Sequence, residues 1–356
     1  MRPNDDIGGG STTNHPSRRA YLGGLGATAF AGLAGCLGGV AGGSSNPDEL
    51  RIAYMPIYPD LQYFVMQEEG YLDELPVDVS AEVFPDGPSI VQAYGSGQFD
   101  VAMFGIVPSM VVIDKGIAAK VVAANIEDAM SVVTTGAFAD RFAEEGADAF
   151  GSFEAEHGRK FRFGTFPPGS VPDIVLRYWM TEHLGVPVEE NVDVVPMGAD
   201  QVRQALLAGE IDGTSIMEPI QTIAVARGDY VRHQNAAEFF PGGQPAAVVL
   251  MNDRFRNEHG DVGRAFLEQH LRATQFILDD PERAAEHAST VIGQNVLPPE
   301  TAKEAIRSPT ANFVSDPRAI EGGTEIFSAF AHELGKLEEE LSLAEIFDFS
   351  LYEDVS

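Results

Sequence analysis

The stretch Arg51-Ile52-Ala53-Tyr54-Met55-Pro56 decides the fold, because a similar stretch, Arg162-Phe163-Gly164-Thr165-Phe166-Pro167, returns 111 residues later. A second pair lies 112 residues apart, where Gln92-Ala93, Gly97 and Asp100 are matched by Gln204-Ala205, Gly209 and Asp212. Each copy has the pattern of a strand, a loop rich in Pro and Gly, a helix, a Gly-x-x-Asp turn and a buried strand. Two echoes at nearly the same offset predict two lobes of like construction with a cleft between them.

Strands and helices alternate around these repeats. Apolar or alternating runs predict strands at 50–54, 77–84, 99–104, 121–125 and 246–251. Helical patterns occupy 61–69, 88–94 and 108–114, and after Asp253 they dominate, at 262–278, 281–292, 300–306 and 322–334. His270 falls on an apolar helix face and is interpreted as a core residue. This alternation of strands and helices predicts an α/β fold with a parallel-rich sheet and a helical C-terminal region.

The first part of the chain has the layout of a lipoprotein export signal. The basic pair Arg18-Arg19 is followed by an uncharged stretch from Ala20 to Pro47. Within that stretch the run Leu33-Ala34-Gly35 precedes Cys36, the only cysteine of the chain. This order resembles a twin-arginine signal that ends in a lipidated cysteine. We therefore expect a signal at 1–35 and a protein tethered outside the cell by a lipid on Cys36.

The composition is strongly acidic, with 54 Asp and Glu against 23 Lys and Arg and a net charge of −31. Residues 1–35 carry a net +1, so the remaining chain carries −32. A hydrophobic content of 44% argues against a disordered acidic tail. Acid spread over a globular body indicates a protein of a salt-loving microbe, because salt screens the self-repulsion. Without a basic patch, nucleic-acid binding is excluded.

An ordered series of short motifs runs from about Leu50 to Tyr352. Its members are Glu69-Gly70-Tyr71, Phe84-Pro85-Asp86-Gly87-Pro88-Ser89, Ser96-Gly97-Gln98-Phe99-Asp100-Val101-Ala102, the Gly105 loop, Gly164-Thr165 with Gly169-Ser170, Ala208-Gly209-Glu210-Ile211-Asp212, Met217-Glu218-Pro219 and Ile346-Phe347-Asp348. In this series the chain resembles periplasmic-type solute-binding proteins for nitrate, sulfonates, taurine and bicarbonate, a family that includes relatives binding a thiamine precursor.

The resemblance implies a two-lobed, periplasmic-binding-protein-like fold (type II) with two crossing strands. Its lobes close over a small solute, which is then delivered to an ABC permease and its ATPase. The expected divisions are a flexible tether at 36–48, lobe 1 at 49–133 and 245–356, and lobe 2 at 134–244. A monomer without cofactor or metal is expected, with an oxyanion or sulfonate favoured as the solute.

Strand-to-helix loops aim helix N-termini at the expected cleft, and unpaired N–H groups there suit an oxyanion. The candidate ligand-binding residues are Tyr58, Gly87, Pro88, Ser89, Gly105, Asn125, Gly169, Ser170 and Glu218. The two serines either touch the ligand or only cap helices. The glycines allow close backbone approach or only shape turns. Tyr58 walls the site or packs in the core, and Asn125 offers an amide at a lobe crossing.

Glu218 leaves the charge of the solute open. It either stabilises a helix N-terminus or faces the ligand, in which case a pyrimidine or another amine-bearing solute is the alternative. Two other classes of function compete. A related enzyme branch makes the thiamine pyrimidine with a cysteine cluster, whereas the sole cysteine here belongs to the signal. A cell-surface sensor that binds a partner protein is the other alternative, and a neighbouring permease gene would argue against it.

The charge excess generates a first prediction. Moving the protein from molar salt to about 0.1 M salt lengthens the Debye length from about 3 Å to about 10 Å, so the carboxylates repel one another. We expect the fold to be lost on dialysis, seen as a change in circular dichroism and a lower melting temperature. An unchanged spectrum and melting temperature would show that the acidity is incidental.

Overall fold

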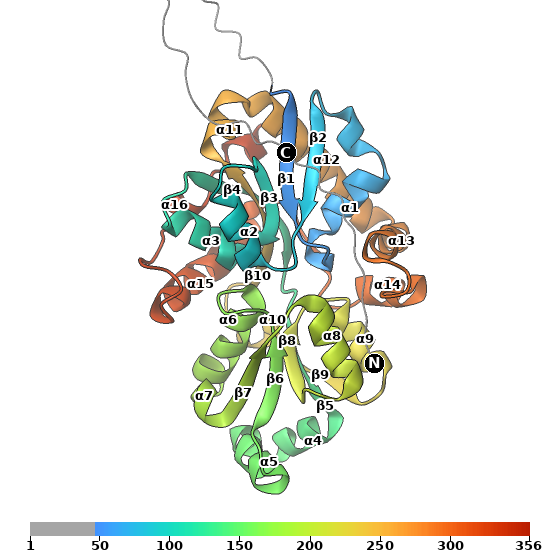
Figure 1. The fold of residues 1–356 in the computed structure, drawn as a ribbon, viewed down its shortest axis with the longest axis vertical. Coiled ribbons are helices and arrows are strands. Elements are labelled where there is room, and N and C mark those ends of the chain that lie inside the picture. The colour runs from blue at the N-terminus through green and yellow to red at the C-terminus, as the bar shows by residue number, and fades with distance from the viewer. Residues whose placement is uncertain (1–46) are drawn as a thin grey trace, which may run out of the picture. The chain divides into compact units, whose positions relative to one another are not determined.

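The computed structural model describes residues 47–356. The predicted export signal, with Arg18, Arg19 and Cys36, lies outside these residues. Within the described part, the chain forms two mixed sheets, each flanked by helices, and Figure 1 shows them as two lobes joined where β10 and the end of β4 meet the second lobe. The predicted two-lobed α/β fold is confirmed.

The first sheet has six strands in the order β11-β4-β10-β3-β1-β2. Their bounds are β1 Glu49–Tyr54, β2 Asp78–Val83, β3 Val101–Gly105, β4 Ala119–Glu127, β10 Pro245–Asn252 and β11 Asn312–Phe313. The second sheet has five strands in the order β7-β6-β8-β5-β9. Their bounds are β5 Ser131–Thr135, β6 Phe161–Thr165, β7 Val192–Pro196, β8 Gly213–Ile216 and β9 Tyr230–Asn235.

The two sheets repeat one plan. In the first, β2, β1 and β3 run parallel and β10 lies antiparallel between β3 and β4. In the second, β7, β6 and β8 run parallel and β5 lies antiparallel between β8 and β9. The echoed stretches at Arg51 and Arg162 are the central parallel strands β1 and β6. The repeat in the sequence therefore reports a repeat in topology.

Helices cover both faces of the sheets. In lobe 1 they are α1 Leu61–Glu68, α2 Gly87–Tyr94, α3 Ile106–Asp114, α11 Asp253–Glu258, α12 Gly260–Asp279, α13 Pro281–Ile292, α14 Pro299–Ile306, α15 Glu321–Glu333, α16 Leu343–Ile346 and α17 Ser350–Glu353. In lobe 2 they are α4 Gly136–Glu145, α5 Ala149–His157, α6 Val171–Tyr178, α7 Val188–Asn191, α8 Ala199–Ala208, α9 Ile220–Ala226 and α10 Ala236–Phe239. The predicted elements are present within one to two residues at most ends.

The chain crosses between the sheets twice, and the two crossings lie side by side. β4 leads into β5 through Asp128–Met130, and α10 leads into β10 through residues 240–244. Asp128 N donates to Gln244 O at 2.7 Å, and Gln244 N donates to Asp128 Oδ1 at 2.7 Å. Met130 N donates to Gln244 Oε1 at 3.1 Å. Residues 131–133, which the sequence assigns to lobe 1, pair in the second sheet, so the crossing comes before Ser131.

The second crossing passes very close to α15. Gly242 and Gly243 have φ values of +80° and +82°, a region that favours glycine. A Cβ placed on Gly323 of α15 would lie 1.9 Å from Gly243 O. The crossing can therefore approach the helix only because position 323 has no side chain. This contact ties the C-terminal helices to the linker between the lobes.

The repeated Gly-x-x-Asp turns have a structural explanation. Asp100 accepts from Arg51 N at 3.1 Å and Asp212 accepts from Arg162 N at 2.8 Å. Each aspartate also donates its own N–H to the carbonyl of the same arginine, at 2.9 Å in both lobes. A guanidinium completes each contact, from Arg51 itself in lobe 1 and from Arg159 in lobe 2. The aspartate thus fixes the start of the central strand in both lobes.

The turn aspartates generate a second prediction. Asp212→Asn removes a largely buried charge that accepts from a backbone N–H and a guanidinium, so we expect a loss of about 1.5–3 kcal/mol in the free energy of unfolding. Asp100→Asn should lose a similar amount from lobe 1. The exposed Asp140→Asn on α4 is the matched control and should change stability by less than about 0.5 kcal/mol. Equal urea midpoints for all three variants and the parent, in molar salt, would contradict the proposed role.

Candidate functional site

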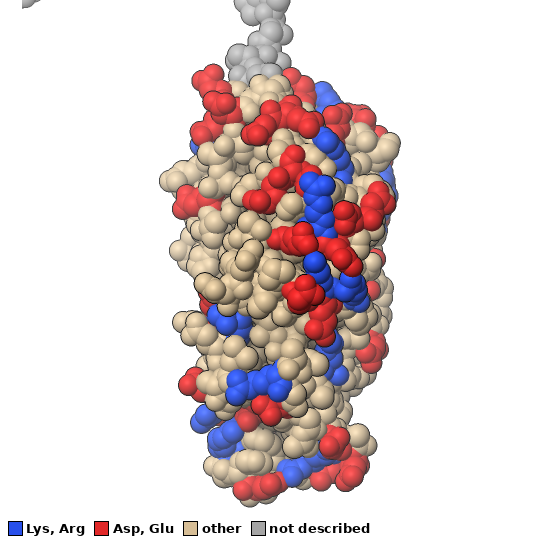
Figure 2. Space-filling view, turned by 90° about the vertical axis from the view of Figure 1, so that its right-hand side faces the viewer, with Lys and Arg blue, Asp and Glu red and all other residues tan. Residues whose placement is uncertain are grey.

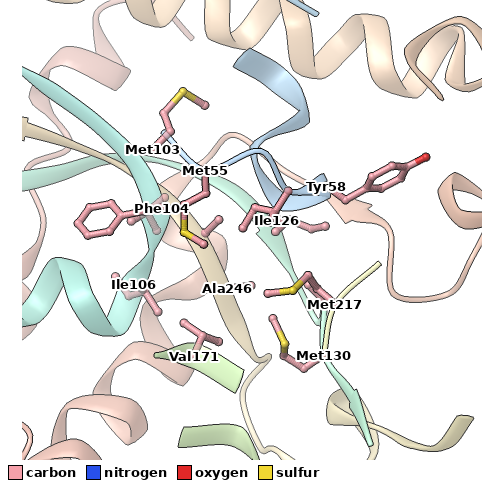
Figure 3. Packing of buried hydrophobic residues seen from close by; sticks show 14 of the residues in the cluster. Met55, Tyr58, Met103, Phe104, Ile106, Ile126, Met130, Val171, Met217 and Ala246 are labelled. Carbon is pink, nitrogen blue, oxygen red and sulfur yellow. The ribbon is translucent and has the colours of Figure 1, made fainter. Parts of the chain in front are cut away.

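A narrow pocket lies between the lobes, next to the first crossing. Its volume is about 20 Å³, which is room for about one water molecule. The lining residues are Met55, Ile57, Pro59, Gly87, Gly105, Pro108, Met130, Phe166, Ser170, Val171, Pro172, Met217, Ala246 and Ala247. Figure 3 shows the thioethers of Met55, Met130 and Met217 turned towards the space beside Ala246, with Val171 opposite.

The pocket is assembled at strand ends from both lobes. Met55 follows β1, Gly105 ends β3, Phe166 follows β6 and Met217 follows β8. Ligands of open α/β sheets bind outside the carboxyl ends of the parallel strands. The pocket satisfies this rule for both sheets at once, so a molecule held there contacts both lobes and the first crossing.

A wider groove continues from the pocket towards solvent. It has a volume of about 560 Å³ and shares Ile57 with the pocket. Lobe 1 lines it with Tyr54, Pro56, Ile57, Val83, Pro85, Asp86, Val291 and Ile292, and lobe 2 lines it with Gly198, Ala199, Asp200 and Gln201. The groove is therefore lined by both lobes and adjoins the pocket at Ile57.

The lobes meet closely around the pocket. A Cβ placed on Gly105 would lie 3.0 Å from Val171 Cγ2 across the cleft. Behind the pocket, the ring of Tyr178 on α6 lies 5.3 Å from that of Phe330 on α15. Phe240, at the second crossing, lies 4.7 Å from Phe327 on the same helix. These contacts describe a closed arrangement of the lobes, which explains the small volume of the pocket.

Three of the predicted ligand residues line the pocket, namely Gly87, Gly105 and Ser170. Gly87 begins α2, and a Cβ there would lie 2.7 Å from Pro108 Cγ, so the position requires glycine for packing. Ser170 is the N-cap of α6 and its Oγ accepts from Asp173 N at 3.4 Å. The helix-capping interpretation of Ser170 agrees with this contact, and its exposure to the pocket keeps the ligand-binding interpretation open.

Pro88, Ser89 and Gly169 lie beside the pocket. Pro88 occupies the first turn of α2, and Ser89 N and Oγ both donate to Asp86 Oδ1, at 2.8 and 2.7 Å. Gly169 has a φ of +87° and donates its N–H to Asp173 Oδ2 at 3.0 Å. All three residues therefore shape the helix ends, and their polar groups already have partners.

Tyr58 and Asn125 are buried in lobe 1. Tyr58 is fully buried and its hydroxyl donates to Ala302 O at 2.6 Å. Burial, with a smaller effect of the Glu218 charge, raises the pKa of Tyr58. Asn125 donates to Asp60 Oδ1 at 3.1 Å and its Oδ1 lies 3.0 Å from His270 Nε2. The core interpretation predicted for Tyr58 and for His270 agrees with these contacts.

The buried group around Asn125 includes a carboxyl that has no cationic partner among residues 47–356. Asp60 accepts from Met55 N at 3.2 Å, directly behind the pocket wall. Complete burial raises the pKa of Asp60 well above its ordinary value, because the charged form loses its hydration. The same cause lowers the pKa of His270 to about 3, so the imidazole is neutral. This network supports the loop that carries Met55.

Glu218 is paired inside lobe 2. It is 2% exposed, and its Oε1 accepts from Arg232 Nη2 at 2.8 Å. Its Oε2 accepts from Thr222 N at 3.1 Å, in the first turn of α9. Gln221 joins this group to the first crossing, since it donates to Ala129 O at 3.1 Å and accepts from Ser131 Oγ at 3.0 Å. The helix-stabilising interpretation of Glu218 is the one that these contacts favour.

The sequence did not single out the methionines and Phe166 that dominate the pocket. Met55 and Phe166 occupy corresponding places in the two echoed stretches, one residue before a proline. Their equivalent positions in two like lobes were a signal that both face the cleft. Met130 and Met217 carry no comparable pattern, because their exposure to the pocket depends on where the strands end.

Residues 47–356 contain no group of three or more His, Cys, Asp and Glu side chains arranged to hold a metal ion. Within the same range, no helix has the length and apolar character needed to cross a bilayer. Figure 2 shows Lys and Arg standing next to Asp and Glu over one face of the molecule. Ion pairs among the described residues include Arg283–Glu69 and Arg307–Glu282.

Curated relatives are recorded as binding proteins. A protein of Brucella abortus (strain 2308) named "Putative binding protein" is 28% identical over 224 residues, which is 62% of this chain and 64% of that protein. Proteins of Brucella suis and Brucella melitensis match to the same extent. The matched region thus spans less than two thirds of the length of these relatives.

Solved structures share the fold. The ligand-binding component of an ABC-type import system from Staphylococcus aureus, solved with zinc bound, has a TM-score of 0.70 at 17% identity, over 87% of this chain and 99% of that one. The nitrate-binding protein NrtA of Synechocystis has a TM-score of 0.69 at 14% identity, over 86% and 88%. The alkanesulfonate-binding protein SsuA of Xanthomonas axonopodis, bound to MOPS, has a TM-score of 0.67 at 15% identity, over 85% and 99%.

The family is shown by the sequence as well as by the fold. The model of the NMT1-like family matches residues 43–292, which include both crossings, the whole of lobe 2 and every residue that lines the pocket. The two mixed sheets, the pocket at their strand ends and the match over more than half of the chain lead to one conclusion. This chain is a member of the NMT1-like family, with the two-lobed fold of the solute-binding proteins of ABC importers.

Proposed function

We propose that this protein captures a small solute between its two lobes and delivers it to an ABC permease with its ATPase. The observation that carries the proposal is the pocket between the lobes, which takes its walls from the strand ends of both sheets and from the first crossing. The pocket as described has room for about one water molecule, so a solute enters when the lobes are further apart. A solute that touches both lobes then favours their closure around it and shifts the population towards that loaded form. The permease then has a closed, loaded form to distinguish from the empty one.

The comparisons support binding as the activity. The structures that share the fold include a nitrate-binding and an alkanesulfonate-binding protein, and the curated relatives carry the name of binding proteins. Gly87, Gly105 and Ser170 are the predicted ligand residues that we keep in this proposal. A sensor role is the second candidate, and a permease gene beside this one would favour transport over it.

The proposal includes export by the twin-arginine route and a lipid anchor on Cys36, outside the cytoplasm of a salt-loving organism. The motive is the order of the basic pair, the uncharged stretch and the lone cysteine. In Cys36→Ser the anchor has no attachment point, so the variant should leave the membrane fraction while the parent stays in it. Equal fractionation of the two proteins would contradict the anchor but not solute binding.

Closure around a solute is tested with two glycine variants. A leucine at Gly105 would collide with Val171 across the cleft, whereas Gly151 on α5 has open space around it. A broad thermal-shift screen in molar salt, with taurine, nitrate and pyrimidines included, should yield ligands that stabilise the parent by about 2.7 kcal/mol at a hundred times their Kd. Gly105→Leu should lose this shift and Gly151→Leu should keep it.

Small-angle scattering supplies the second readout. A ligand from the screen should reduce the radius of gyration of the parent and of Gly151→Leu but not of Gly105→Leu. If Gly105→Leu binds as tightly as the parent, the solute does not occupy this cleft. If no compound of the screen stabilises the parent, the solute-binding proposal itself fails.

A further inference from the structure

We infer that the cleft takes an uncharged solute with a hydrocarbon or aromatic body, in place of the oxyanion that the sequence favoured. The inference rests on the proposed function and narrows the solute to one chemical class. Three features carry it: the lining of the pocket, the helix ends that face it and the carboxyl groups around it.

The lining of the pocket offers almost no partner for a charge. None of its fourteen residues is Lys, Arg or His, and Ser170 carries the only polar side chain. The rest are methionines, prolines, glycines and other apolar residues, with Phe166 as the aromatic member. An anion would lose its hydration there without compensation. Methionine thioethers, in contrast, adapt to irregular apolar bodies and make favourable contacts with aromatic rings.

The helix ends beside the pocket have few free N–H groups. Each of α2, α3 and α6 has a proline in its first turn, at Pro88, Pro108 and Pro172, and proline has no N–H to donate. Two further N–H groups are used within the protein, because Ser89 N donates to Asp86 and Asp173 N donates to Ser170. An oxyanion site needs several converging N–H donors, and these prolines and internal hydrogen bonds reduce the number that α2, α3 and α6 can offer.

Carboxylates already occupy the positive ends of the helices. Asp86 caps α2, Asp173 lies in the first turn of α6 and binds Gly169 N, and Glu218 binds the first turn of α9. Of the three, Asp173 and Glu218 are also paired with arginines of their own lobe. A negatively charged solute would pass the carboxylate of Asp86, which lines the groove. A cationic solute finds no carboxylate in the wall of the pocket, because none of the fourteen lining residues is Asp or Glu.

Lys336 is the cationic side chain whose contact with the solute must be tested by experiment. It is half-buried near the end of α15, and its Cδ lies 3.9 Å from the place of a Cβ on Gly169. It lines neither the pocket nor the groove. If the solute is neutral, Lys336 does not contribute to binding. If the solute is an anion, Lys336 is the side chain that a small shift of the Gly169 loop would bring to it.

Pairs of compounds that share a carbon skeleton but differ in charge distinguish a neutral solute from an anionic one. Benzamide and benzyl alcohol are compared with benzoate and benzenesulfonate, and cyclohexanol with cyclohexanecarboxylate, and inorganic nitrate and sulfate are added as bare anions. Calorimetry is done on the full protein in molar KCl, so that distant charges are screened. We expect the neutral member of at least one pair to bind at least about tenfold more tightly than its anionic partner, a difference of about 1.4 kcal/mol.

Variants place the neutral compound in the pocket. Met217→Gln and Met55→Gln put an amide into the wall from opposite lobes and should each weaken the neutral compound by about tenfold or more. Met217→Leu keeps the apolar volume and should bind within a few-fold of the parent. Lys336→Gln should leave the affinity unchanged. Melting temperatures of all four variants show whether a loss of binding reflects loss of fold.

Each opposite outcome overturns the inference. One is an anionic member that binds as tightly as its neutral partner and loses affinity in Lys336→Gln, in which case solute capture stands and the class of solute is wrong. Another is the absence of binding by every neutral compound at millimolar concentration. The proposed function fails separately, only when the broad screen also yields no ligand.

Discussion

The pairing of Asp128 with Gln244 is the contact on which the arrangement of the molecule depends. It joins the two crossings through backbone and side-chain hydrogen bonds at one place, so the two connections between the sheets are held side by side. Both sheets have the same strand arrangement on their side of the crossings. The carboxyl ends of both sets of parallel strands therefore face the same space. Asp128 adopts a φ of +52°, which a non-glycine residue tolerates only where its surroundings fix it.

The polar groups near the cleft are largely satisfied within each lobe. Asp60 with Asn125, Asp86 with Ser89 and Glu218 with Arg232 are three such groups, and each belongs to one lobe. The walls of the pocket are consequently apolar apart from Ser170. Closure therefore depends on hydrophobic contact and shape, which suits a solute that supplies its own apolar surface to both walls.

Much of the fold could be predicted from the sequence, because the two repeated stretches contain residues that have the same structural role in both lobes. Asp100 and Asp212 recur because each fixes the first residues of a central strand. The pocket was less predictable. Helix N-termini are visible in a sequence, but whether their N–H groups are free depends on local caps such as that of Asp86 on Ser89. The exposure of Met130 and Met217 to the pocket depends on where the strands end and on where the chain crosses between the lobes. The sequence pattern predicted this crossing after residue 133, whereas it comes before Ser131.

The place of β10 has a consequence for how the chain folds during synthesis. This strand lies between β3 and β4 in the first sheet, yet it is made only after the whole of lobe 2. Lobe 2 can therefore complete its sheet while the growing chain still lacks β10, the strand between β3 and β4 of lobe 1. Pairing of β3 with β10 then closes a loop of more than a hundred residues, a step that is slow for entropic reasons. Lobe 1 is the last part to become native, and its unpaired strands need protection from aggregation until then.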